Sequence, residues 1–124
     1  VDMQIHQSAE DYLEKILMLH ERLGYARSVD IATELNVTKP SVSVAMKRLR
    51  ENNYILMDKD GLITLTPAGK EIADRIYDRH KVLSAFFREL GVDSEVAAED
   101  ACKVEHVISD ESFAAVCRFV HKSL

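Results

Sequence analysis

Three side chains near the end of the chain combine residue types that bind transition metals. Cys102, Glu105 and His106 stand at positions i, i+3 and i+4 of a run whose pattern predicts a helix. On a helix this spacing places a thiol, a carboxylate and an imidazole on one face, within about one turn. Such a mixed donor set suits a divalent ion of borderline softness. The last third of the chain therefore predicts a metal site.

Further candidate ligands are distant in the sequence. Asp11 and Glu14 offer carboxylates near the start, and His80 offers an imidazole in the middle. Each has a plainer interpretation when taken alone. Asp11 fits a capping box with Ser8, Glu14 fits a solvated helix position, His80 fits a core histidine, and Cys102 fits a small buried apolar residue. Buried carboxylates are costly without a cation, however, and this favours a shared metal site.

The composition is that of an ordinary globular protein of one domain or two small ones. The 124 residues are 47% hydrophobic and 30% charged, with a net charge of −5. No apolar run approaches the roughly 20 residues of a membrane span, and the start lacks a signal-peptide pattern. Two cysteines are too few for a disulfide framework. We therefore expect a cytoplasmic protein with no membrane partner.

The apolar periodicity predicts mainly helices and one hairpin. An Asp-Gly pair between two extended runs is a strong hairpin signal. Ser28 is expected to cap the second helix, Val44 to help bury the third, and His20 to lie at the surface. The expected helices cover about 8–23, 28–35, 38–50, 67–90, 93–108 and 109–124, and the expected strands cover 54–57 and 62–65.

This order of elements is that of a winged helix-turn-helix, in which the second and third helices form the helix-turn-helix and the hairpin forms the wing. The predicted fold class is therefore mainly α. Residues 1–70 form a winged helix-turn-helix domain with a small two-stranded wing. Residues 71–124 form a helical domain, and the long helix 67–90 connects the two.

The charge distribution agrees with a DNA-contacting first domain. Residues 26–59 carry six Lys/Arg against four Asp/Glu, a net charge of +2, whereas residues 84–124 carry four against eight, a net of −4. A basic segment inside an acidic protein suits DNA contact, although the same cations also fit a solvated face. Hydroxyls can reach bases or phosphates, and lysines suit phosphates. The candidate DNA-binding residues are Arg27, Thr38, Lys39, Pro40, Ser41, Ser43, Lys47, Arg48 and Lys59.

Several stretches together resemble a known family. They are Ser8 to Glu14, Tyr25 to Arg27, Leu65 to Lys70, Arg79-His80 and Asp100 to Glu111. With these stretches the chain resembles the metal-dependent repressors of the diphtheria toxin repressor family, which include the manganese transport regulators. The resemblance covers nearly the whole chain. A single helix-turn-helix is a weak signal, but the last stretch following a winged helix is specific.

The resemblance implies a homodimer with a helical dimerisation region. Its Mn²⁺- or Fe²⁺-loaded form would bind a palindromic double-stranded operator and repress metal-uptake genes, with Co²⁺, Ni²⁺ or Zn²⁺ as possible surrogates. The iron-responsive branch usually adds a C-terminal SH3-like domain, so the length of this chain is closer to the manganese branch. The implied metal ligands are Asp11, Glu14, His80, Cys102, Glu105 and His106.

The implied ligand set is a hybrid of two branches. Cys102 stands where the manganese branch usually has a glutamate, and it matches the iron branch. Asp11 instead matches the manganese branch, since the iron branch would have a methionine there. Ser84 and Ala98 occupy two positions of the iron branch's ancillary site. The metal and the number of ions per subunit therefore stay open.

Three other functions compete with this one. A winged-helix regulator could respond to a small organic ligand, or to oxidation of Cys102. A metalloenzyme is disfavoured, because the sequence has no HExxH motif and no obvious general base beside an open metal position. We expect no enzymatic activity and no small-molecule substrate.

Overall fold

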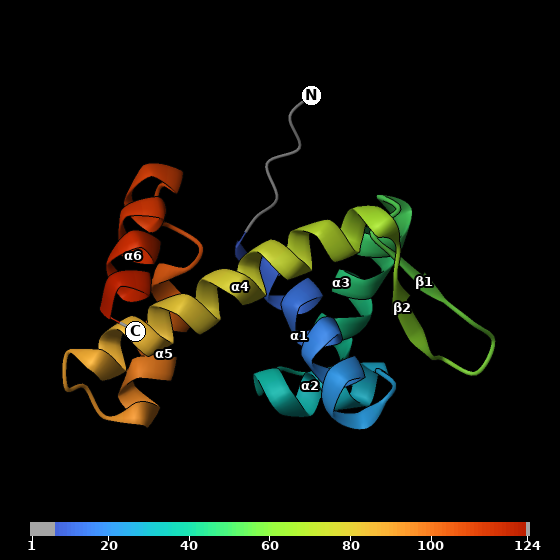
Figure 1. Ribbon diagram of the computed structural model, residues 1–124. Coiled ribbons are helices and arrows are strands. Elements are labelled where there is room, and N and C mark those ends of the chain that lie inside the picture. Colours follow the sequence, from blue (N-terminus) through green and yellow to red (C-terminus); the bar gives the residue numbers. More distant parts are fainter. Residues whose placement is uncertain (1–6, 124) are drawn as a thin grey trace. The chain divides into compact units, whose positions relative to one another are not determined.

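The computed structural model describes residues 7–123, which form six helices and one hairpin (Figure 1). The mainly α fold predicted from the sequence is confirmed. No helix of the described range is long and apolar enough to cross a membrane. The elements are α1 (Gln7–Leu23), α2 (Ser28–Leu35), α3 (Lys39–Glu51), β1 (Ile55–Met57), β2 (Ile63–Leu65), α4 (Pro67–Glu89), α5 (Ser94–Val104) and α6 (Asp110–Ser123).

The chain divides into two compact units, and the division falls inside α4. The first unit ends at Asp74 and the second begins at Arg75. The first contains the three N-terminal helices, the hairpin and the start of α4. The second contains the rest of α4 with α5 and α6.

In the first unit, α2 and α3 pack as a helix-turn-helix against α1. The turn is possible because Asn36 adopts a left-handed conformation (φ 54°), which asparagine tolerates better than most residues. Thr38 then caps α3 by accepting a hydrogen bond from the Ser41 amide (3.3 Å), and Pro40 lies in the first helical turn. The apolar core of this unit includes Leu13, Ile16, Leu19, Ile31, Val42, Met46, Leu49, Ile55 and Ile63.

The hairpin pairs β1 with β2 (Figure 1), and the register is antiparallel with Ile55 opposite Leu65. The Asp58 carboxylate shapes its turn by accepting hydrogen bonds from the amides of Asp60 and Leu62, both at 2.9 Å. Gly61 takes the positive φ of 79° that the turn requires.

His20 anchors the hairpin to α1, because its Nε2 donates a hydrogen bond to the carbonyl oxygen of Ile63 at 2.7 Å. The assignment of His20 to the surface was therefore wrong. The sequence shows no sign of this bond, because the partner is a backbone atom 43 residues away.

In the second unit, aromatic rings join α4 to α6. Phe86 meets Phe119 edge to face, with ring centroids 5.7 Å apart, and Phe86 also lies beside Phe87 at 5.8 Å. The quadrupole moments of aromatic rings favour this edge-to-face arrangement. Gly91 adopts a positive φ of 99° after the end of α4.

Three local expectations differ from the structure. Ser28 is the first residue of α2 and not its cap; Arg27 occupies the cap position, and its side chain makes no capping hydrogen bond. Val44 is 53% exposed, because it lies on the opposite side of α3 from the buried Val42 and Met46. The fifth helix ends at Val104 and does not continue to residue 108.

Candidate metal centre and nucleic-acid interface

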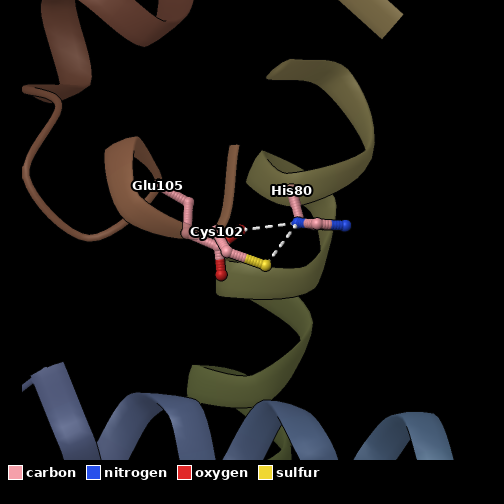
Figure 2. Close-up of side chains that lie close together, drawn as sticks. All are labelled: His80, Cys102 and Glu105. Atoms are coloured by element: carbon pink, nitrogen blue, oxygen red, sulfur yellow. Dashed lines mark hydrogen bonds and ion pairs between the residues drawn. The ribbon is translucent and has the colours of Figure 1, made fainter. Parts of the chain in front are cut away.

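Three potential metal ligands converge within the second unit (Figure 2). His80 extends from α4, Cys102 extends from α5, and Glu105 is the C-cap residue directly after α5. His80 Nδ1 lies 2.9 Å from Glu105 Oε1 and 3.6 Å from Cys102 Sγ. The imidazole is thus in contact with both other donors, although it is 22 to 25 residues distant in the sequence.

Glu105 lies between two imidazoles. Its Oε1 faces His80, and its Oε2 lies 3.5 Å from His106 Nε2. The side chains of Glu105 and His106 are 0% and 1% exposed, whereas Cys102 is exposed. A carboxylate taken out of water needs charge compensation, which a protonated imidazole or a bound cation can supply.

The end of α5 determines how these ligands are presented. Glu105 keeps helical dihedrals (φ −57°, ψ −26°), and its amide still donates to the Ala101 carbonyl at 2.9 Å. The helix nevertheless stops there. The predicted continuation of this helix to about residue 108 was therefore wrong, but Cys102 and Glu105 still lie close together, as their spacing predicts.

Arg79 holds the segment that follows α5. Its guanidinium donates to the carbonyl oxygens of Glu105 (3.3 Å) and Ile108 (2.8 Å), and it also pairs with the Asp110 carboxylate. Its side chain is only 7% exposed, and its guanidinium carbon lies 5.1 Å from the centroid of the Phe113 ring. Arg79 therefore fixes the backbone that carries Glu105.

This role of Arg79 was not predicted from the sequence, although a signal was present. Arg79 follows Ile76 by three residues and precedes Leu83 by four, so helical periodicity places it on the buried stripe of α4. Both of those apolar residues are 1% exposed. An arginine on such a stripe requires buried acceptors, and the ends of two neighbouring helices supply them.

The donor set of the second unit fits a divalent transition metal. His80, Cys102 and Glu105 each offer one ligand atom, and these atoms all lie within 4.8 Å of one another. Two donors on one ion are at most two bond lengths apart, roughly 4–4.6 Å for nitrogen, oxygen and sulfur ligands. The spacing of the three ligand atoms is therefore close to what one shared ion requires. One thiol, one carboxylate and one imidazole form a mixed set, softer than an all-oxygen site.

The two remaining candidate ligands lie on α1, in the first unit. Asp11 is half-buried and Glu14 is 5% exposed. The helical pattern alone would place Glu14 at a solvated position, so its burial is unexpected. Their participation in the same site as Glu105 stays a prediction.

All nine candidate DNA-binding residues are exposed within the first unit. Most lie on or just before α3, while Arg27 precedes α2 and Lys59 lies in the hairpin turn. Thr38 is engaged in capping, and its hydroxyl also donates to Ser41 Oγ at 2.8 Å. The hydroxyl hydrogen of Ser41 stays available for another acceptor.

Two family models together match nearly all of this sequence. Residues 4–63 match the N-terminal DNA-binding domain of the iron-dependent repressors, and residues 66–123 match their metal-binding and dimerisation domain. The chain belongs to the diphtheria toxin repressor family of metal-dependent regulators. The predicted fold and family are thereby confirmed, and the family consists of DNA-binding transcriptional repressors that depend on metal.

Individual members of this family agree with the assignment. The chain is 42% identical to the transcriptional regulator MntR of Bacillus pumilus, over 82% of this chain and 71% of that protein. Among solved structures it is similar to T. acidophilum IdeR (TM-score 0.80, 30% identity, 88% of this chain) and to the manganese regulator SloR (TM-score 0.79, 29% identity, 96% of this chain). The chain spans only 52% and 55% of the length of those two chains.

Proposed function

We propose that this protein is a metal-responsive repressor in which Mn²⁺ or Fe²⁺ promotes binding of a homodimer to a palindromic operator, and that it represses metal-uptake genes. The observation that carries the proposal is the cluster of His80, Cys102 and Glu105 inside the segment matched to a metal-binding and dimerisation domain. The segment matched to a DNA-binding domain contains the exposed polar face of α3. One chain thus contains both parts that such a repressor needs.

We infer that the functional domains are residues 1–70 for DNA binding and 71–124 for metal binding and dimerisation, with the helix 67–90 as connector. The full ligand set would be Asp11, Glu14, His80, Cys102, Glu105 and His106. The buried Glu105 is central to this proposal, because the imidazoles of His80 and His106 lie at its two oxygens. A bound cation would supply the positive charge that compensates these carboxylates.

The residues of this chain would then act in three places. His80 on α4 and Glu105 after α5 bring two elements of the second unit together. Arg79 keeps the backbone of Glu105 in place. Asp11 and Glu14 would extend the ligand set to α1, the helix on which α2 and α3 pack. Ligands from both domains would therefore make operator binding depend on metal, and a coupling of about 2–3 kcal/mol changes affinity roughly 30- to 150-fold.

On the operator, we infer that α3 enters the major groove while Lys59 in the hairpin turn reaches a phosphate. A dimer places two such helices about one DNA turn apart, which matches a palindrome. Lys39 and Lys47 suit phosphate contacts, whereas Ser41 and Ser43 can reach base edges.

The identity of the metal depends on Cys102. Thiolate ligands favour Fe²⁺, Co²⁺ or Zn²⁺, and carboxylates such as Asp11 favour Mn²⁺. Co²⁺ is a direct probe, because a Co²⁺–thiolate bond adds a charge-transfer absorption in the near ultraviolet. We expect this band in the wild-type protein and in Cys117→Ser, whose substituted thiol lies on α6 outside the cluster. Cys102→Ser should lose the band, and its persistence would exclude Cys102 as a ligand.

The experiment that tests the proposed function measures binding to the DNA upstream of the gene that encodes the protein. Binding is compared in chelator and in titrations of Mn²⁺, anaerobic Fe²⁺, Co²⁺ and Zn²⁺. We expect tight binding only with metal, and weaker binding by Lys47→Ala than by Lys70→Ala, an exposed lysine on α4. Equally tight binding in chelator would contradict metal control. Oxidation of the exposed Cys102 thiol would then be the alternative signal. In that case the Cys102→Ser variant should no longer respond to oxidants.

A further inference from the structure

Val44 stands in the middle of the exposed face of α3. The buried face of this helix consists of Val42, Met46 and Leu49, which are 0%, 2% and 5% exposed. At 100° per residue, Val44 points almost directly away from the centre of that face. It is 53% exposed and contributes little to the core.

The neighbours of Val44 distinguish it from an ordinary exposed apolar residue. Single exposed valines are common and need no explanation by themselves. Pro40 lies one turn before Val44, however, and Lys47 lies one turn after it, and both are exposed. Ser43 and Arg48 flank it on either side. A small apolar spot is thus enclosed by the hydroxyl and cationic groups that suit a DNA groove.

The chemistry of Val44 restricts what it can recognise. An isopropyl group can neither donate nor accept a hydrogen bond, so it cannot read the polar edges of base pairs. In the major groove, thymine alone among the four bases presents a methyl group, and apolar side chains recognise thymine through it. Val44 lies in the second turn of α3, near the N-terminal end that approaches base edges in helix-turn-helix proteins.

We propose that Val44 reads a thymine in each operator half-site by packing against its C5-methyl group. This proposal rests on the proposed function, since it requires α3 to be the recognition helix. Removal of one methyl from an apolar contact weakens binding about four-fold. The affinity for a symmetric operator should therefore fall about 15-fold when the methyl group is removed from both half-sites.

The test uses the tightest duplex selected from a random-sequence library by the metal-loaded protein. Each thymine is replaced in turn by 2′-deoxyuridine, which removes the methyl and leaves every hydrogen-bonding group in place. We expect one symmetric pair of positions at which wild-type affinity falls about 15-fold. Val44→Ser should bind the thymine and uridine duplexes equally at this pair. Serine and valine have similar helix propensities, so α3 should be retained.

Val29→Ser is the matched control, because Val29 on α2 is also exposed (48%). It should keep the wild-type preference for thymine. Uridine substitutions without effect on the wild type, or with an equal effect on Val44→Ser, would overturn the proposal while leaving repressor function intact. Failure to select any duplex with any metal would overturn both the proposal and the proposed function.

Discussion

Replacement of Arg79 by methionine tests whether one buried cation organises the metal-binding unit. Methionine keeps much of the aliphatic length of arginine but removes its donors. The carbonyl oxygens of Glu105 and Ile108 then lose a charged donor, at 3.3 Å and 2.8 Å respectively. Hydrogen bonds to charged groups contribute about 1.5–3 kcal/mol each, and the longer bond counts at the low end. We expect a loss of about 3–4.5 kcal/mol of unfolding free energy.

The ion pair of Arg79 with Asp110 should contribute much less. The Asp110 carboxylate is 94% exposed, so water and salt screen its attraction to the guanidinium. Asp110→Asn should therefore cost about 1 kcal/mol or less. The contrast between these two variants separates the buried carbonyl contacts from the surface charge pair.

Urea unfolding of the metal-free protein, followed by circular dichroism, measures both variants. Arg79→Met should unfold at a clearly lower urea concentration than Asp110→Asn, and its affinity for Co²⁺ should also fall, because the backbone of Glu105 loses its support. A loss below about 1 kcal/mol in Arg79→Met, or equal losses in the two variants, would refute the assignment of Arg79 as the organising residue.

Three further perturbations follow from the structure. Gly69→Ala places a Cβ 2.0 Å from the carbonyl oxygen of Tyr54, a backbone atom that cannot move aside. We expect the unfolding free energy measured in urea to fall by more than about 2 kcal/mol. A near-neutral result would contradict this close approach. His20→Ala removes the donor to the Ile63 carbonyl, and a loss of about 1–2 kcal/mol is expected, with faster amide hydrogen exchange in β2 as the local readout. Cys102→Ser should leave unfolding of the metal-free protein within about 0.5 kcal/mol of wild type, because the thiol is exposed, while it weakens Co²⁺ binding; a large loss of stability without metal would indicate a packing role.

The sequence determined the order and type of the elements because local signals encode them. Apolar positions recur with helical spacing in the six helices, and Asp60-Gly61 marks the hairpin turn. Thr38 and Pro40 mark the start of α3 in the same local way. The residue types at 102, 105 and 106, with His80 as a further candidate, also predicted metal-binding chemistry, because a thiol, a carboxylate and an imidazole together suit a divalent transition metal.

Only the tertiary structure decided which of these groups meet and how they are supported. His80 reaches Glu105 and Cys102 because α4 and α5 pack together, and no periodicity in one helix specifies that contact. Helix α5 ends at Val104, and the carbonyl oxygen of Glu105, the next residue, accepts a hydrogen bond from Arg79. The C-terminal end of α5 therefore depends on a donor 26 residues away in the sequence. The bond of His20 to the hairpin likewise depends on where the hairpin lies relative to α1. Local sequence thus fixes elements and chemistry, whereas burial and long-range hydrogen bonds determine which residues act together.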